Sequence, residues 1–482
     1  MLLILFKKLI NLLYSQFYSY HMTVRIDHDS LGEIKVPINA YYGPFTARAM
    51  EQYRVTGRKS HINLIKAYVM IKRSAALTNF ELGVLDDKIA KSIIQTCDEI
   101  LSGQFLDQFV IEDINSGAGT AFNMNTNEII ANRSLEILGK SKGDYTLVNP
   151  NDHVNMSQSS NDTFPTAMHI AILMNIILTV QSLDILITSL KKKSNDFKNI
   201  IKIGRTHLMD AIPVTLGSEF EAYVFALERC KEEIINSQRN LEFIGLGGTA
   251  VGTGANTPKG YRENVVKHLS NISGISLKIS RNLHFSLQSK FDVCDCSSGL
   301  RNLALELIKL ANDLRLMASG PLAGFAEIIL AAVHPGSSIM PGKVNPSLAE
   351  CLNMICFDIV GRDVSVAMAA QAGQFELNVM MPSMVKNVLE ITDMLINFLP
   401  IFAKNFIDGI QPNSEKLKEQ MEKSPILVTL LNPYIGYLKA AEIYKESLKT
   451  GRGIRELVLE KKLMKEKEIE DALSYERIFG TV

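Results

Sequence analysis

The sequence predicts a mainly α-helical protein with a central bundle of long helices. The first observation is a set of four long runs with helical periodicity, at 166–192, 217–244, 299–318 and 347–372. The second is that polar, glycine-rich segments separate helical runs, as loops separate helices. The third is composition, because 46% of the 482 residues are apolar, enough for a large core. Helices this long cannot bury their apolar faces in one small domain, so we expect an oligomer.

The N-terminal region begins with a segment that we exclude from the fold. Residues 1–21 are apolar, but Lys7 and Lys8 interrupt them and no small-residue cleavage site follows, so they make a poor signal peptide. We interpret them as an upstream extension or a weak targeting arm. From Val24 to Gly43 the chain alternates and turns, which predicts short strands. We expect the first helices near Ile62.

The sequence predicts three domains, divided where long helical runs begin after, or give way to, segments with frequent turns. We place the boundaries near Pro165 and Asn413. The predicted domains are a mixed, mostly helical domain at 22–164, a central helical bundle at 165–412 with a polar loop at 334–346, and a small helical domain at 413–482.

Charge and hydropathy exclude several classes of partner. Lys and Arg total 51 against 51 Asp and Glu, and no basic run carries interleaved aromatic residues, so nucleic acid is not an expected partner. The uncharged run 163–183 is long enough to span a bilayer, but its polar residues His169, Asn175 and Gln181 favour a helix buried in a bundle. We therefore expect no membrane partner.

The cysteines favour a reduced, cytoplasmic location. Six cysteines are too few for a disulfide scaffold in a chain of 482 residues. The close pair Cys294 and Cys296 has no neighbouring His or second pair, so we interpret both as small buried hydrophobic residues and predict no metal site.

Four polar loops between helices carry hydrogen-bond donors, nearly all of them neutral, with few acids among them. Each Ser, Thr or Asn taken alone is better explained as a helix cap. Taken together they suit a small dianion, because hydroxyl and amide donors with one lysine can hold carboxylates. The residues are Thr120, Asn123, Ser159, Ser160, Asn161, Thr206, His207, Lys343 and Asn345.

Two glycine-rich segments fail as nucleotide-binding loops. In 336–343, five residues rather than four separate the glycines, and Val344 stands where Ser or Thr would reach magnesium. The segment 247–254 lacks the preceding strand and the helix entry of a dinucleotide fingerprint. We interpret both as turns.

The chain resembles the fumarase and aspartase superfamily from Val24 to about Leu473. The string GSSIMPGKVNP at 336–346 is nearly that superfamily's hallmark, and the likeness continues through SQSSNDTFPTAMHIA, GRTHLMDAIPVTLGSEF, GGTAVGTGANTP, KLANDLRLMASGP, GQFELNV and LNPYIGY. The resemblance implies a three-domain fold whose central helices form one bundle in a homotetramer, with active sites that take residues from three subunits. It also implies a small dicarboxylate substrate.

The same resemblance implies roles for the loop residues. Ser337 would be the general base that removes a proton from the carbon next to a carboxylate, and Lys343 and Asn345 would hold a substrate carboxylate. His207 would be paired with Glu350. The other donors would surround the substrate: Thr120, Asn123, Ser159, Ser160, Asn161 and Thr206. No redox or organic cofactor is implied, and activation by a divalent cation is left open.

Local features favour the aspartase branch over class II fumarase. AYYG at 40–43, GAGT with Ala118, NMNTNE at 123–128 and NPND with Asn149 are similar to aspartases, whereas TAMHIA and NTPKG are similar to fumarases. We therefore predict an aspartate ammonia-lyase. The alternatives are a class II fumarate hydratase or a divergent member that acts on another succinyl-type substrate.

Three departures from the family pattern touch the loops. Leu322 replaces the usual Arg, Met209 replaces the usual Gln, and Ala331 with Ala332 replaces the usual Leu-Pro before the catalytic loop. None removes a predicted catalytic residue. A non-catalytic scaffold that kept the fold is disfavoured because Ser337, Lys343, Asn345 and His207 are all present.

Overall fold

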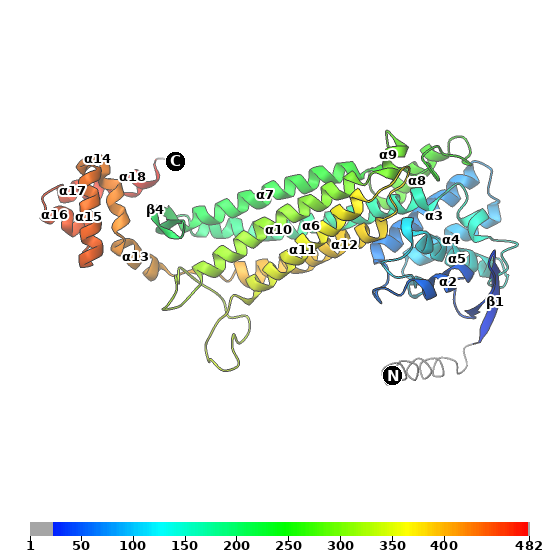
Figure 1. Ribbon diagram of the computed structural model, residues 1–482, viewed down its shortest axis with the longest axis horizontal. Helices are drawn as coiled ribbons and strands as arrows, with labels where there is room; N and C mark the ends of the chain where they lie inside the picture. Colours follow the sequence, from blue (N-terminus) through cyan, green and yellow to red (C-terminus); the bar gives the residue numbers. More distant parts are fainter. Residues whose placement is uncertain (1–22, 481–482) are drawn as a thin grey trace. The chain divides into compact units, whose positions relative to one another are not determined.

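The computed structural model describes residues 23–480 and confirms a mainly helical protein (Figure 1). The predicted arm at 1–21 lies outside the described residues. The chain groups into two compact units. Unit 1 contains the residues up to 178 together with 234–299 and 361–393, and unit 2 contains 179–233, 300–360 and the residues from 394 onward. Each unit draws on more than one predicted domain, so the domain boundaries stay a prediction.

The long helices confirm the periodicity in the sequence. Hydrogen bonds join α6 to α12 through Asn175 and Thr392, and α10 to α11 through Asn312 and Asn353. Helix α10 begins eight residues before the predicted start at 299, and α12 was not predicted. The bounds are α6 (Ser160–Asp196), α7 (Leu216–Leu241), α10 (Phe291–Met317), α11 (Ser347–Gln371) and α12 (Met381–Phe402).

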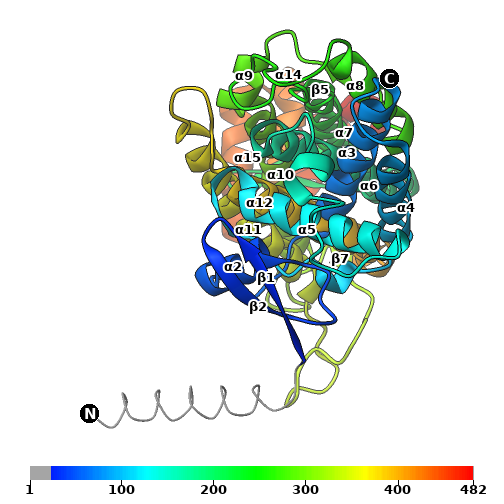
Figure 2. The same ribbon diagram turned by 90° about the vertical axis from the view of Figure 1, so that its right-hand side faces the viewer.

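Unit 1 begins with the predicted strands, which form an antiparallel hairpin. A helix then starts at Pro44, earlier than the predicted Ile62, because the Glu128 carboxylate accepts the backbone N–H groups of Gly43, Phe45 and Thr46. Helix α3 lies beside α4 and α8 (Figure 2). The bounds are β1 (Val24–Asp29), β2 (Gly32–Pro37), α2 (Pro44–Gln52), α3 (Ile62–Glu81), α4 (Asp87–Leu101), α5 (Thr120–Ile137), β5 (Phe243–Ile244), α8 (Tyr261–Ser273), β6 (Lys278–Ile279) and α9 (Leu283–Gln288).

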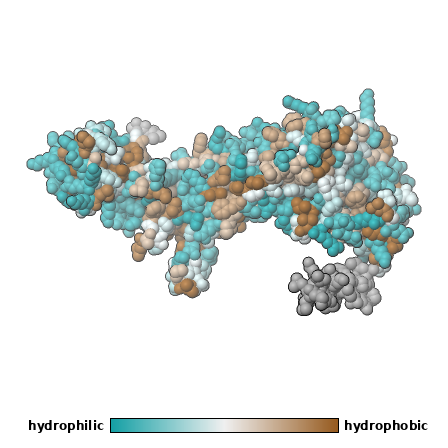
Figure 3. All heavy atoms as spheres, in the orientation of Figure 1, coloured by the Kyte–Doolittle hydropathy of each residue, from teal (hydrophilic) through white to brown (hydrophobic). Residues whose placement is uncertain are grey.

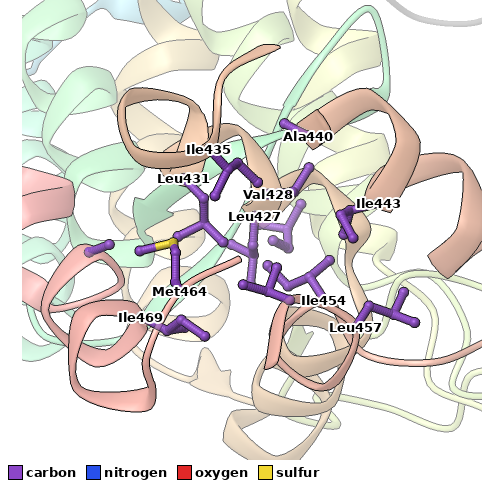
Figure 4. Packing of buried hydrophobic residues seen from close by; sticks show 13 residues of the cluster. Leu427, Val428, Leu431, Ile435, Ala440, Ile443, Ile454, Leu457, Met464 and Ile469 are labelled. Carbon is purple, nitrogen blue, oxygen red and sulfur yellow. The ribbon is translucent and has the colours of Figure 1, made fainter. Parts of the chain in front are cut away.

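Unit 2 carries two short sheets and the C-terminal helices. Its C-terminal core gathers Leu427, Leu431 and Leu457 with Ile203 of β3, so this core packs against the β3–β4 hairpin (Figure 4). The bounds are β3 (Ile201–Thr206), β4 (Met209–Thr215), β7 (Ile328–Ile329), β8 (Gln411–Pro412), α13 (Ser414–Lys423), α14 (Asn432–Ile435), α15 (Tyr437–Thr450), α16 (Ile454–Glu460), α17 (Glu466–Ala472) and α18 (Tyr475–Phe479).

Short 3-10 and π segments complete the described chain. They are η1 (Leu106–Gln108), η2 (Gly117–Gly119), η3 (Pro150–Val154), η4 (Ala403–Ile407) and η5 (Pro425–Leu431).

Within residues 23–480, α6 is the one helix long and apolar enough to cross a membrane, and most of that apolar stretch is buried inside the protein. Two of its polar side chains have buried partners. The amide of Asn175 donates to Thr392 and Asp393, and Nδ1 of His169 donates to the Leu241 carbonyl. These partners are typical of a core helix.

Burial lowers the pKa of His169 to about 4, from an ordinary value near 6.5. The native state therefore keeps His169 neutral while the unfolded chain takes up a proton, so stability is lost as the pH falls from about 6.5 to about 4. We expect about 3 kcal/mol of acid destabilisation from this group. Urea unfolding of wild type and His169→Gln at pH 7.5 and pH 4 measures it. An equal acid loss in both proteins would contradict the assignment.

Candidate active site

In unit 1, Thr120 and Ser160 meet at the first residues of two helices. Their hydroxyl oxygens are 3.2 Å apart. Thr120 opens α5 because Gly119 before it has φ +63°, and a Cβ there would lie 1.9 Å from the Phe164 ring. Only glycine fits this turn. The hydroxyls of Thr120 and Ser160 are thereby held as a pair.

The start of α6 is fixed by a buried carboxylate. Asp162 accepts the backbone N–H of Ser159 at 3.0 Å, of Gly247 at 3.0 Å and of Thr249 at 2.9 Å. Burial raises the pKa of Asp162 to about 6, against the opposing effect of these hydrogen bonds. The amide of Asn161 also donates to the Ala250 carbonyl at 2.8 Å. The glycine-rich segment 247–254 therefore forms turns that dock on the start of α6.

Asn123 faces the interior rather than an open site. It is 4% exposed, and its Oδ1 accepts from the Lys72 ammonium at 2.7 Å and from the Tyr68 hydroxyl at 3.3 Å. Its Nδ2 donates to Asn155 at 3.3 Å. Both ends of the Asn123 amide are thus engaged within the chain. Direct contact of Asn123 with substrate stays a prediction.

Lys72 is a buried cation that the sequence analysis missed. Its ammonium binds two amide oxygens, those of Asn123 and Asn155, and has no carboxylate within ion-pair distance among residues 23–480. Burial lowers the pKa of Lys72 to about 7. No local signal marks it, because it lies in the middle of the apolar helix α3.

In unit 2, the β3–β4 hairpin presents His207 at its tip. Thr206 pairs with Met209, which leaves His207 and Leu208 as a two-residue turn. Their φ angles are +56° and +61°. Such turns are usually Asn-Gly, so two larger residues in the left-handed region carry strain. Strain of this kind is typical of functional sites, and it leaves Thr206 and His207 exposed.

Ser337 lies in a loop that closes on itself. The Ser337 Oγ accepts the backbone N–H of Met340 at 3.0 Å and of Ile339 at 3.3 Å. A Cβ on Gly336 would lie 2.0 Å from the Lys343 carbonyl oxygen, so the two ends of the loop touch only because residue 336 is glycine. The Asn345 amide donates to the Gly336 carbonyl and holds the same closure.

A cavity of about 830 Å³ within unit 2 lies beside this loop. Lys343 and Arg315 supply positive charge to it, and Asn312, Ser319 and Asn345 supply neutral donors. The Lys343 side chain is exposed and has no ion pair within residues 23–480. Its charge is available for an anionic ligand.

Glu350 and His207 do not pair within residues 23–480 of one chain. The resemblance implies sites shared between subunits, so their pairing stays a prediction. Glu350 lies in the first turn of α11, and its nearest cation is Arg315 at 3.9 Å. His207, at the hairpin tip, has no hydrogen-bond partner among residues 23–480.

Known proteins match the chain over most of its length. A sequence profile described as "Lyase" matches residues 32–361, and one described as "Fumarase C C-terminus" matches 427–480. An aspartate ammonia-lyase of Bacillus sp. is 44% identical over 94% of this chain and 96% of its own. The chain belongs to the fumarase and aspartase family of lyases.

This lyase family includes class II fumarate hydratases as well as aspartate ammonia-lyases. A class II fumarate hydratase of Helicobacter pylori (strain J99) is 42% identical, over 95% of this chain and 99% of its own. A crystal structure of class II fumarase from Schistosoma mansoni has a TM-score of 0.92 at 36% identity, over 95% of this chain and 100% of that one. The family and its fold are thereby shown, and the substrate is a separate question.

The departures from the family pattern fall at exposed positions. Leu322 is 95% exposed and Met209 is 70% exposed, and Ala331 and Ala332 are also exposed. None of these side chains has a core position in this lyase. Their effect would therefore fall on a ligand or a neighbouring chain.

Gly336→Ala should inactivate the lyase without unfolding it. The added Cβ would overlap the Lys343 carbonyl oxygen and open the loop around Ser337. Because misplacement by about 1 Å can cost about 100-fold in rate, we expect a loss of that order in turnover. The loop is exposed, so the melting temperature should stay within about 2 °C of wild type. Steady-state kinetics and calorimetry measure both, and unchanged turnover would contradict the loop geometry.

Proposed function

We propose that this lyase is an aspartate ammonia-lyase, which converts L-aspartate reversibly to fumarate and ammonia. The observation that carries the proposal is the loop at 336–345, which contains both the Ser337 hydroxyl and an exposed Lys343 that forms no ion pair within residues 23–480. A cation and a hydroxyl in one tight loop suit a substrate that has an acidic C–H beside a carboxylate. The reaction transfers no electrons, so we propose no redox cofactor.

The donor sets fit a dicarboxylate. Lys343 supplies a full positive charge for one carboxylate, and Thr120 with Ser160 supplies two hydroxyls for the other. Neutral donors suit the second carboxylate because they leave no buried charge unpaired when the site is empty. Lys343 belongs to unit 2, and Thr120 and Ser160 belong to unit 1. We propose that assembly of the oligomer brings these residues to one substrate.

Ser337 is the proposed general base. A serine hydroxyl is a weak base, but the N–H groups of Ile339 and Met340 donate to its oxygen and would stabilise a developing alkoxide. Removal of the C3 proton by Ser337 places the electron pair in an aci-carboxylate, whose extra negative charge Lys343 and Asn345 would stabilise. The electron pair then forms the C2–C3 double bond as ammonia leaves C2. The ammonium group already carries its proton, so this departure needs no separate acid.

Two of the aspartase-like sequence features form a single contact. The Glu128 carboxylate of NMNTNE binds the backbone at Gly43 of AYYG, and a Cβ on Gly43 would lie 2.3 Å from the Tyr145 hydroxyl. A third feature, Asn149, caps the segment η3 with its side chain. These features support kinship with the aspartase branch through packing rather than through contact with the substrate.

Class II fumarate hydratase is the second candidate, because a fumarase relative is 42% identical to this chain and an aspartase relative is 44% identical. Purified enzyme is mixed separately with L-aspartate and with L-malate, and fumarate is followed by ultraviolet absorbance. Fumarate from aspartate alone supports the proposal. Fumarate from malate alone would replace it with the second candidate.

The long helices support an oligomer. On α11, exposed Met354, Phe357, Val364 and Met368, with Gly361 between them, follow a 3, 4, 3, 4 spacing. This heptad spacing is typical of a seam between helices, and glycine permits close approach. Hydrophobic side chains are visible on the surface of the long helices in Figure 3. We propose that these stripes meet in a homotetramer.

Ser337→Ala should reduce turnover by at least about 1,000-fold, because the variant loses the proposed base. Ser338→Ala is the matched control, since Ser338 lies in the same exposed loop and should leave turnover within about twofold. Steady-state assays of both variants, with their assembly state checked by light scattering, test the assignment. Near-normal turnover in Ser337→Ala would remove Ser337 from the role of base.

Phe357→Glu should break the assembly. Phe357 is 59% exposed at the centre of the α11 stripe, and a buried, unpaired carboxylate there would cost several kcal/mol, roughly 3–5, per seam. We expect monomers or dimers by analytical ultracentrifugation, with unit folds retained by circular dichroism. Glu228→Gln, at a charged position on α7, is the control. An intact tetramer in Phe357→Glu would contradict the seam.

A further inference from the structure

Unit 2 contains a buried cluster of four charged residues that the proposed mechanism does not use. Lys202 and Arg205 lie on β3, Glu219 lies on α7, and Glu327 directly precedes β7. The Lys202 ammonium is 2.8 Å from Glu327 and 2.9 Å from Glu219, and the Arg205 guanidinium is 2.6 Å from Glu327. Glu327 is fully buried and Lys202 is 2% exposed. Two cations and two carboxylates thus balance inside the protein.

Glu327 is held at its backbone as firmly as at its side chain. Its N–H donates to the Met317 carbonyl at 2.8 Å, and its carbonyl accepts the Asn413 N–H at 2.9 Å. The next two residues, Ile328 and Ile329, pair with β8. The chain then enters the loop that carries Ser337. Glu327 is therefore a fixed point at the entry of that loop.

The other side of the cluster is the hairpin that carries His207. Arg205 lies two residues before His207 and pairs across the hairpin with Asp210. Its guanidinium also lies over the Phe325 ring at 4.2 Å, which adds a second contact to the same segment. Residues 205 and 327 are 122 positions apart in sequence. Within residues 23–480, one further ion pair joins the hairpin to this segment, that of Lys202 with Glu327.

We propose that Glu327 is a positioning residue, whose carboxylate fixes the Thr206–His207 hairpin against the strand that leads into the Ser337 loop. The inference deepens the proposed function and rests on it for the role of Ser337, and it takes Thr206 and His207 as the site residues that the family resemblance implies. The cluster is more than a structural ion pair because it joins the two catalytic segments of unit 2. A buried pair of this kind adds little net stability but fixes a specific geometry.

The two glutamates of the cluster allow a matched comparison. In Glu327→Gln, Arg205 loses its carboxylate while Lys202 keeps Glu219. In Glu219→Gln, Glu327 still pairs with both Lys202 and Arg205. Both variants remove one carboxylate from the same cluster. Only Glu327→Gln removes the ion pairs between the hairpin and the segment that leads into the Ser337 loop.

We expect Glu327→Gln to lower kcat at least about tenfold per folded protein and Glu219→Gln to leave it within about twofold. The pH profile of kcat/KM should change shape in Glu327→Gln and match that of wild type in Glu219→Gln. Backbone hydrogen exchange measured on the full chain should rise at 206–209 and at 330–346 in Glu327→Gln, and in neither segment in Glu219→Gln. Equal effects of the two variants would overturn the proposal.

Glu327→Gln leaves the Arg205 charge without its carboxylate partner, and an unpaired charge of this kind can prevent folding. A double variant therefore provides a second test. Arg205→Met with Glu327→Leu removes both partners and leaves the Lys202–Glu219 pair. The folded double variant should stay at least about tenfold below wild type and show the same rise in exchange. If the double variant has wild-type kcat and wild-type protection from hydrogen exchange, the proposal is overturned. Hydrogen exchange does not depend on turnover. If the wild type is inactive toward aspartate and malate, the proposed function is wrong, but the exchange test of Glu327 still applies.

Discussion

The uncovered apolar stripe on the long helices is the constraint on which the rest of the account depends. On α11, Met354, Phe357, Val364 and Met368 are each more than half exposed at heptad spacing. Covering such a seam is favourable by about 25 cal/mol for each Å² of apolar surface removed from water. We propose that association of these helices covers the stripe and that the placement of the catalytic groups follows from it.

Each unit combines accessible candidate site residues with buried charged residues that hold neighbouring segments in place. In unit 2, His207 at the hairpin tip and Lys343 in the loop are exposed, and the buried Glu327 carboxylate holds the hairpin strand. In unit 1, Thr120 and Ser160 are partly exposed, and the buried residues Lys72 and Asp162 hold their neighbours Asn123 and Ser159. Buried charges tolerate few alternative geometries, so they suit the task of holding exposed loops in register.

The sequence predicted the parts that depend on local pattern. Apolar periodicity located α6, α7 and α11, and turn residues with alternation located the first hairpin. Helix α12 was not predicted, and α2 was missed because its start depends on Glu128, far along the chain. The candidate substrate donors were predicted only as residue types in loops, and their contact with substrate stays a prediction.

Pattern could not show which way a donor points. Asn123 lies one turn after Thr120 on α5, yet its amide turns inward to Lys72. The link between Arg205 and Glu327 joins positions 122 residues apart, and no local spacing signals it. Such long-range polar contacts come from tertiary packing, which a single sequence does not display.

Subunit complementation tests the central claim that assembly completes the site. One variant carries Ser337→Ala, and the other carries Thr120→Ala with Ser160→Ala, so each is defective in one part of the proposed site. If different chains supply the two parts, refolding an equal mixture should restore about a quarter of wild-type activity, the value for random mixing. If one chain supplies both parts to each site, every site in the mixture keeps a defect. Activity no higher than that of the separate variants would contradict the account.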